Sequence, residues 1–171
     1  MRILFFLLFL LHYDCFSQNF ISKTGEITFF SYAPIEDIKA INENVSAAFN
    51  SQTNDIVFVL DITDFNFKKK LMQEHFNENY LESDVYPTSS FEGKVYNIDD
   101  SLVTVKGILT IHGVSNEIIA DGSFNLLDNT IQLSSSFMIR LEDYNVQIPK
   151  IVMYKIAEEI LVDINMILIK T

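Results

Sequence analysis

Alternation of apolar and polar residues is the feature of this sequence that most restricts its fold. In SLVTVKGILTIHG, which begins at Ser101, Val103, Val105 and Leu109 fall on one face, while polar residues such as Thr104 fall on the other. A period of two is typical of a strand with one buried and one exposed face. The same pattern predicts further strands at 25–33, 54–63, 88–98, 115–124, 130–141 and 159–170.

Residues 38–49 fit either a helix or a strand. Their apolar residues have a helical spacing from Ile38 and an alternating one from Val45. The tetrapeptide Asn-Ser-Gln-Thr at 50–53 is typical of a hairpin turn, which favours a strand on each side of it. We therefore predict a strand here, which brings the number of strands to eight.

Eight consecutive strands with short connections can close into an antiparallel up-and-down β-barrel. The long connection, residues 64–87, places Met72, Phe76 and Tyr80 at every fourth position, and Pro87 prevents continuation of a helix. The predicted fold is therefore all-β and mainly antiparallel, with one principal helix near 68–82 that covers an end of the barrel. A short helical turn is also expected at 149–157.

The inward-facing residues decide whether such a barrel is filled or hollow. If residues 113–114 form a two-residue turn, Gly107 lies opposite Ala120. If the loop NLLDN at 125–129 joins the next two strands, Ala120 lies opposite Ser135. Three small residues would then form one row and leave space inside the barrel.

Large aromatic residues could fill that space instead. Phe58, Phe76 or Phe91 could reach across the barrel, since protein interiors are close-packed. Eight-stranded barrels either fill their interior with side chains or hold one small ligand. The sequence leaves both possibilities open.

The N-terminus has the pattern of a secretory signal peptide. One arginine precedes nine consecutive apolar residues, Ile3–Leu11, a run too short to span a bilayer. Residues 1–18 are expected to be cleaved, which leaves a domain at 19–171 in the periplasm or outside the cell. The large and charged residues before Cys15 are unlike a lipoprotein signal, and a mature chain from Asn19 would contain no cysteine.

The chain is acidic, with 23 Asp and Glu against 12 Lys and Arg and a formal net charge of −11. Removal of residues 1–18 takes away Arg2 and Asp14 together, so this charge does not change. A negative surface repels phosphates, which argues against nucleic acid or anionic headgroups as partners. The charge is more typical of a solvated surface.

No pattern for catalysis or metal binding is found. His75 and His112 are the only histidines after residue 18 and belong to no metal-ligand motif; His112 is interpreted as an exposed turn residue. A nucleophile elbow and a glycine-rich phosphate loop are also missing from the sequence. Catalytic residues, metals and cofactors are therefore not expected, and Glu43 with Ser135 is the one pairing an enzyme could use.

Four segments resemble the YceI-like family in the order expected for it: SYAPIEDIKAIN, DFNFKKKLMQEHFNENYLESDVYPTSSFEGKV, GILTIHGVSNEI and DYNVQIPKIVMYKIAEEILVDINMIL. The resemblance implies an extended lipocalin-like barrel with a helix over it. Some members of that family carry a polyisoprenoid chain in the barrel. The chain is similar to a shorter, exported branch of the family in Bacteroidetes-like bacteria.

The predicted function is non-catalytic binding or carriage of an elongated apolar molecule, an isoprenoid or a fatty acyl chain, with its head near the helix. The alternatives are a packed barrel that acts as an exported protein-interaction module and, third, an enzyme. The sequence does not indicate an oligomeric state. The predicted ligand-binding residues are Phe58, Phe65, Phe67, Met72, Phe76, Phe91, Gly107, Ala120, Ser135, Phe137 and Tyr144.

Overall fold

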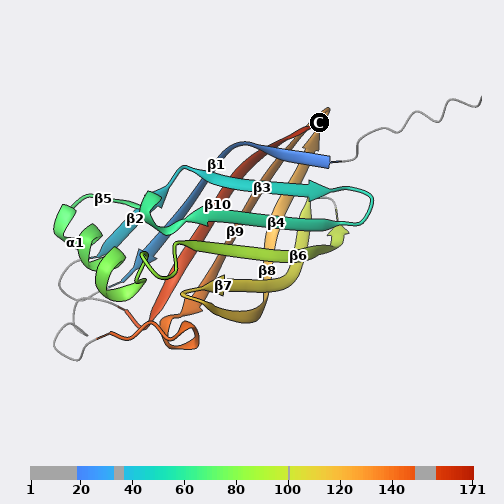
Figure 1. Cartoon of the computed structure of the whole chain (residues 1–171). Helices are drawn as coiled ribbons and strands as arrows, with labels where there is room; N and C mark the ends of the chain where they lie inside the picture. Colours follow the sequence, from blue (N-terminus) through green and yellow to red (C-terminus); the bar gives the residue numbers. More distant parts are fainter. Residues whose placement is uncertain (1–18, 33–36, 100, 149–156) are drawn as a thin grey trace, which may run out of the picture.

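The computed structural model describes residues 19–32, 37–99, 101–148 and 157–171. They form a closed antiparallel barrel, as predicted, because β1 pairs with β10 as well as with β2 and β3 (Figure 1). β2 and β3 both pair with β1, one after the other, and together form one strand of the wall. β5 adds only two residues beside β2. The barrel wall therefore has eight strands. The strands are β1 (Asn19–Ser31), β2 (Ile38–Asn42), β3 (Val45–Asn50), β4 (Asp55–Asp61), β5 (Asn66–Phe67), β6 (Thr88–Asp99), β7 (Leu102–Ile111), β8 (Val114–Leu127), β9 (Thr130–Arg140) and β10 (Glu159–Lys170).

The strand predicted at 38–49 exists, but it is interrupted between β2 and β3. Asn42 is fully buried at the interruption. Its Nδ2 donates to the carbonyl oxygen of Asp61 at 2.9 Å, and its Oδ1 accepts from the backbone N–H of Asn44 at 2.8 Å. These two bonds satisfy the buried amide and fix the bend, so that one wall strand can follow β1 in two segments.

The predicted helix covers one end of the barrel (Figure 1). It is shorter than 68–82 and changes from an α-helix to a wider π-helical turn within that range. Met72, Phe76 and Tyr80 pack against the barrel core, as their spacing predicts. The turn expected at 149–157 falls almost entirely at 149–156, outside the described residues. The helical elements are η1 (Ile62–Asp64), α1 (Lys70–His75), η2 (Phe76–Tyr80) and η3 (Leu141–Tyr144).

The predicted register between β7 and β8 is wrong by two residues. The turn is His112-Gly113, with φ of 51° and 71°, and Ile111 pairs with Val114. A two-residue turn of this hand needs positive φ at both positions, which histidine and glycine tolerate far better than the β-branched Val114. Gly107 therefore lies opposite Ile118 rather than Ala120.

The register between β8 and β9 is also shifted by two residues. The loop is the two-residue Asp128-Asn129, and Leu127 pairs with Thr130. Ser135 therefore lies opposite Gly122, so the predicted row of Gly107, Ala120 and Ser135 does not form. A shift of two preserves the face on which each side chain lies, so the residues predicted to point inward still do so.

The end of the barrel away from the helix is packed. Phe49 lies between Phe20 and Phe124, with ring centroids 6.3 and 5.0 Å away, and all three rings are buried. Met166 is buried in the same half, where Gly25 leaves it room: a Cβ at Gly25 would lie 2.2 Å from the Met166 sulfur. Large side chains thus close this end of the barrel.

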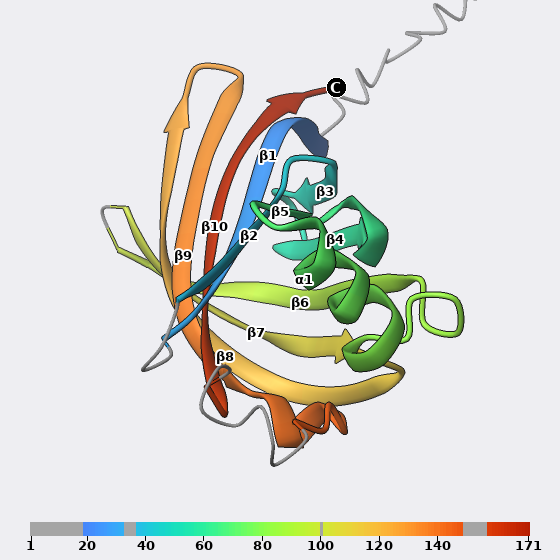
Figure 2. The same ribbon diagram turned by 90° about the vertical axis from the view of Figure 1, so that its left-hand side faces the viewer.

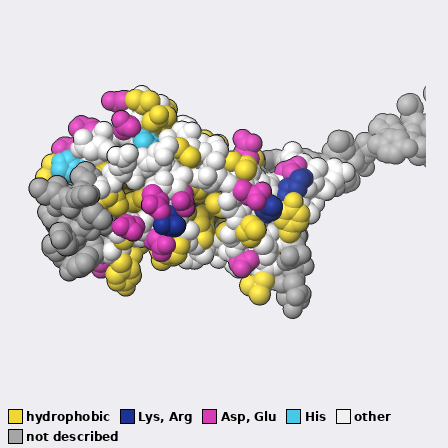
Figure 3. All heavy atoms as spheres, turned by 90° about the horizontal axis from the view of Figure 1, so that it is seen from below, with side chains coloured by type: hydrophobic (Ala, Val, Ile, Leu, Met, Phe, Trp, Pro, Cys, Tyr) yellow, Lys and Arg dark blue, Asp and Glu magenta, His cyan; other side chains and the backbone are white. Residues whose placement is uncertain are grey.

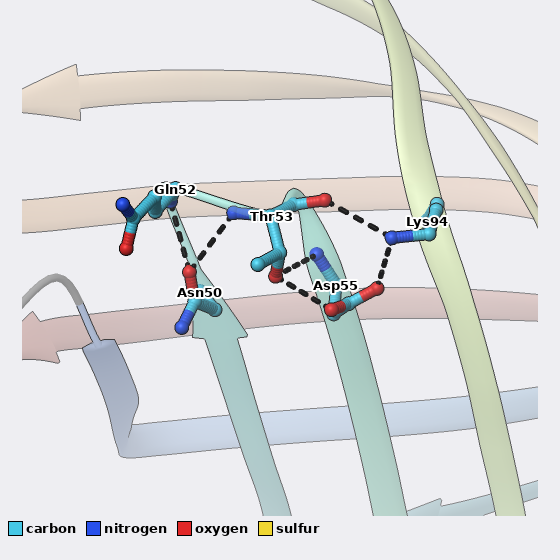
Figure 4. Close-up of polar contacts among 5 residues, drawn as sticks. All are labelled: Asn50, Gln52, Thr53, Asp55 and Lys94. Atoms are coloured by element: carbon cyan, nitrogen blue, oxygen red, sulfur yellow. Dashed lines mark hydrogen bonds and ion pairs between the residues drawn. The ribbon is translucent and has the colours of Figure 1, made fainter.

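A polar network covers the β3–β4 hairpin at the packed end (Figure 4). The side chain of Asn50 accepts hydrogen bonds from the N–H groups of Gln52 and Thr53 at 2.9 and 3.0 Å. Lys94 donates to Asp55 at 2.5 Å and to the carbonyl oxygen of Thr53 at 3.1 Å. The Thr53 hydroxyl also donates to the Asp55 carboxylate. The pKa of Asp55 is lowered most by the hydrogen bond from Lys94 and next by the one from Thr53. The network is solvent-exposed and fixes the shape of the turn.

Candidate functional site

A cavity of about 200 Å³ occupies the half of the barrel nearer the helix. Its walls come from β1, β4, β6, β7, β8, β9 and β10, and α1 and η2 contribute to its end. Most of the residues that the sequence predicts to bind a ligand lie on its wall. Ten of the eleven predicted ligand-binding residues line the cavity: Phe58, Phe65, Phe67, Met72, Phe76, Phe91, Ala120, Ser135, Phe137 and Tyr144.

Gly107 is the predicted residue that does not line the cavity. A Cβ at this position would lie 2.5 Å from the Cα of Gly93, its partner on β6, and 2.6 Å from the ring of Phe91. The ring of Phe91 therefore lies close against two paired glycines. Gly107 leaves room for this aromatic side chain rather than for a ligand, so the alternative that Phe91 fills space inside the barrel is correct at this position.

An aromatic cluster closes the cavity beneath the helix. Phe76 of η2 stacks on Phe29 with centroids 5.3 Å apart and contacts Phe65 and Phe67 at 5.6 and 4.9 Å. The cluster joins β1, the η1–β5 segment and the helix. Sequence reasoning missed Phe29, although the alternation in GEITFFSYA places it on the same face as Ile27, which is also buried.

The cavity lining carries no charge. All of the lining residues belong to the described part of the chain, and none of them is Asp, Glu, Lys, Arg or His. Four of its five serine hydroxyls are hydrogen-bonded within the protein: Ser31 accepts from the N–H of Ala157, Ser89 and Ser135 donate to carbonyl oxygens, and Ser134 bonds to the hydroxyl of Ser123. An ionised ligand group would find no counter-charge here, so the cavity suits uncharged, apolar groups.

Two tyrosines contribute the remaining polar groups. Burial raises the pKa of Tyr80. Burial, and secondarily the charge of Asp143, raise the pKa of Tyr144, and a hydrogen bond with Asn116 opposes the rise. Both phenols are therefore neutral over the physiological range, and the lining stays uncharged when they are counted.

The sequence model of the YceI-like domain matches residues 18–168 of the chain. The chain belongs to the YceI-like family. No curated protein matches it. Among solved structures, a polyisoprenoid binding domain from Saccharophagus degradans, implicated in plant cell wall breakdown, has a TM-score of 0.77 at 14% identity, with 90% of this chain and 99% of that one covered.

Two further solved structures share the YceI-like fold. BcnA of Burkholderia cenocepacia has a TM-score of 0.75 at 14% identity, with 84% of this chain and 95% of that one covered. The YCEI protein of Campylobacter jejuni has a TM-score of 0.70 at 19% identity, with 82% and 89% covered. At these identities the similarity establishes the fold of the barrel.

His112 ties together three segments at the helix end of the YceI-like barrel. Its Nε2 lies 2.8 Å from a carboxylate oxygen of Glu82, its Nδ1 lies 3.2 Å from the carbonyl oxygen of Tyr144, and its ring packs edge-on against Tyr86. The side chain is only 10% exposed. His112 is a turn residue, as interpreted, but it is not exposed, because its side chain folds back between η3 and the turn after η2.

The two residues considered for an enzyme lie apart in the YceI-like barrel. Glu43 is exposed and does not line the cavity that Ser135 lines, so the pairing considered for an enzyme is not brought together. No group of three His, Cys, Asp or Glu side chains among the described residues could hold a metal ion. In the same residues, no helix is both long and apolar enough to cross a bilayer.

Proposed function

We propose that this YceI-like barrel binds one end of a chain-like apolar molecule, an isoprenoid or a fatty acyl chain, without acting on it chemically. The observation that carries the proposal is the cavity, because it is lined by apolar and uncharged side chains over its whole extent. The name of the S. degradans relative, a polyisoprenoid binding domain, supports the same ligand class. The proposed ligand is held by apolar contact rather than by charge.

The size of the cavity limits how much of a ligand it can hold. A dry apolar cavity of about 150 Å³ accepts benzene, and this one measures about 200 Å³. It therefore holds on the order of eight carbon atoms in its present shape. Each buried methylene contributes about 0.8 kcal/mol, or about fourfold in affinity, so affinity should rise steeply with chain length until the space is filled.

The competing function, a packed barrel that recruits a protein through its outer face, requires a filled interior. The packed half of the barrel meets that requirement, but the half beneath the helix does not. A non-catalytic role is supported by the uncharged lining, because general acid–base and nucleophilic catalysis need ionisable groups that converge on a substrate. Ligand binding is thus the better account of the hollow half.

Export is part of the proposal. The run Ile3–Leu11 supports a cleaved signal peptide, and the match to the family begins at residue 18, next to the proposed mature N-terminus at Asn19. Sequencing the N-terminus of protein recovered from its host tests this. Recovery of a chain that retains residues 1–18 in the cytoplasm would contradict it.

Titration with a chain-length series tests ligand binding. We expect linear alcohols to displace the uncharged fluorophore N-phenyl-1-naphthylamine, with octan-1-ol at least tenfold tighter than hexan-1-ol because it buries two more methylene groups, and with geraniol and farnesol within about threefold of one another because both exceed the cavity. Ala120→Leu should weaken binding by taking up cavity volume, whereas Val57→Leu, on the outer face of β4, should leave it unchanged. Failure of the wild type to bind fluorophore, geraniol and farnesol alike would refute the proposed function.

A further inference from the structure

The barrel wall divides between β8 and β9 in its helix half. β8 pairs with β7 from Val114 to Ser123, but with β9 only from Gly122 to Leu127. β9, in contrast, pairs with β10 along its whole length. Figure 2 shows the cause: β8 bends from the direction of β7 into that of β9. Among the described residues, no β8–β9 pair lies on the helix side of Gly122 and Ser135.

The resulting gap, termed the β8–β9 split, has defined ends. At one end, Ser135 Oγ donates to the carbonyl oxygen of Asp121 at 2.7 Å. At the other end, Asn116 Nδ2 donates to the carbonyl oxygen of Asp143 in η3 at 2.6 Å. The five β8 residues between Asn116 and Gly122 span about 17 Å at the rise of an extended strand, so the split is long enough to pass a chain lying along it.

The cavity extends to this split. Ile118 and Ala120 line it from β8, and Phe137 and Ile139 line it from β9. The cavity therefore reaches the inner side of the β8–β9 split.

Aromatic side chains pack at both ends of the barrel in the described part of the chain. The aromatic cluster around Phe76 covers the helix end, and His112 fastens the turn after η2 to η3. The rings around Phe49 fill the opposite end. A chain longer than the cavity must still leave the barrel somewhere, and the β8–β9 split is the gap in the wall that the described residues provide.

Apolar side chains flank the split on the outside. Ile119 of β8 is 65% exposed and Met138 of β9 is 54% exposed. Continuing the β8–β9 register past its last pair places these two residues opposite one another. Exposed apolar groups on both edges of an opening can contact the part of a chain that does not fit inside.

The surroundings of the split are acidic. Asp121, Asp143 and Asp163 lie on β8, η3 and β10, and the nearby cations are engaged: Lys106 lies 3.1 Å from Glu117, and Arg140 pairs with Glu142. Seen from below the barrel, the surface likewise carries more acidic than basic side chains, with hydrophobic ones among them (Figure 3). An anionic head placed here would meet like charge.

We propose that the β8–β9 split is the entrance to the cavity, and that its acidic surroundings select chains with an uncharged head, such as an alcohol, over phosphorylated or carboxylated ones. The inference rests on the proposed function and deepens it. It places the ligand head at the split, in contrast to the sequence-based expectation of a head near the helix. The tail then occupies the cavity and the head remains outside it.

Crosslinking across the split tests the entrance. In a Cys15→Ser background, Ile119→Cys with Met138→Cys is joined by a short bismaleimide, and Asn125→Cys with Gln132→Cys, a pair in the intact part of the same two strands, is the matched control. Stopped-flow mixing with N-phenyl-1-naphthylamine should show association and dissociation at least tenfold slower after crosslinking at 119 and 138, with the control within twofold of its uncrosslinked form. Ile119→Trp, on the outer edge of the split and not in the cavity lining, narrows the split without a reagent and should slow both rates as well.

Rates that are unchanged by the crosslink or by Ile119→Trp, in protein that still binds the fluorophore, overturn the entrance and leave the proposed function standing. A wild type that binds no fluorophore and no farnesol overturns the proposed function and this inference with it. The two failures are therefore distinguishable by the equilibrium titration alone.

A headgroup series tests the selectivity. Farnesol should displace the fluorophore at least tenfold more effectively than farnesyl diphosphate, and Asp121→Asn with Asp163→Asn should reduce that ratio at least threefold. Asp128→Asn with Glu92→Gln removes the same charge away from the split and should leave the ratio unchanged. Equal or tighter binding of the diphosphate by the wild type overturns the selectivity.

Discussion

The two ends of this barrel are built from the same strands but have opposite interiors. At the end away from the helix, Phe20, Phe49, Phe124 and Met166 fill the space. In the helix half, apolar side chains line a cavity instead of filling it. Alternation is equally regular in both halves, so the strand pattern alone does not show where a barrel is hollow.

Loss of a ring should therefore cost far more at the packed end than in the hollow half. Phe49 is 3% exposed and contacts two other rings, so Phe49→Ala should lower the free energy of unfolding by about 3–5 kcal/mol. Phe137→Ala, which removes a half-buried ring that already borders empty space, should cost less than about 2 kcal/mol. Urea unfolding of both variants measures the difference; equal losses would mean that the two halves are packed alike.

Added volume should show the same contrast between a filled and a hollow position. A Cβ at Gly107 would lie 2.3 Å from the carbonyl oxygen of Glu92, a backbone atom that cannot move aside easily. Gly107→Ala should therefore destabilise the barrel by about 1–3 kcal/mol or more. Ala120→Leu faces the cavity and should cost less than about 1 kcal/mol. Thermal unfolding without ligand compares them, and a more stable Gly107→Ala would contradict the close strand contact.

Removing the side-chain contacts of His112 with Glu82 and Tyr144 should destabilise the helix end of the barrel and leave the other end unchanged. His112→Asn keeps a residue that tolerates the positive φ of 51° but is too short to reach Glu82. We expect a loss of about 1 kcal/mol and faster amide exchange in residues 82–86. Hydrogen exchange followed by mass spectrometry reports both ends at once; faster exchange in the β3–β4 hairpin as well would show that the ends are not independent.

Alkaline pH should weaken the helix end through Tyr144. Its pKa is raised by burial above the ordinary value of 10.0, so the unfolded chain loses this proton at a lower pH than the folded one. The stabilisation is present in full below pH 10.0 and is lost as the pH rises through the folded-state pKa. Tyr144→Phe should make the free energy of unfolding depend less on pH between pH 9 and 11. The same pH dependence in the variant and the wild type would argue against a buried phenol.

The smallest effect is expected at the hairpin of the packed end. The pKa of Asp55 is lowered mainly by the hydrogen bond from Lys94, so the stabilisation is present above the ordinary value of 3.8 and is lost as the pH falls through the lower folded-state pKa. Because the pair is exposed and screened, Lys94→Gln should change little at neutral pH. Carbon-detected titration of the Asp55 carboxylate should show its pKa rising toward 3.8 in the variant, with no change at Tyr144.

The sequence was sufficient for the barrel and its helix because both depend on periodicity. Ten of the eleven residues predicted from it lie in the cavity lining. A register error of two residues does not change the face of the strand on which a side chain lies. Gly107 was misplaced because its neighbours depend on the register itself, which His112-Gly113 sets through turn chemistry.

Other features leave no periodic trace in the sequence. β8 alternates along most of its length whether or not β9 accompanies it, so the β8–β9 split could not be predicted. The fold of His112 against Glu82 and Tyr144 joins segments 30 or more residues apart in the sequence, and neither partner is marked by a motif. Features that depend on contacts between distant segments thus required the three-dimensional structure.

Closure of the barrel by β1 and β10 has a consequence for the time at which the protein can fold. These strands are the first and last of the described chain, and they pair over most of their length, with Phe20 opposite Lys170. A ribosome that still holds β10 holds back one edge of the barrel, so a growing chain has two unpaired sheet edges until β10 has emerged. Contacts so distant in the sequence form slowly. The barrel can therefore close only after β10 has emerged, and until then the exposed edges of β1 and of the growing sheet are free to pair wrongly.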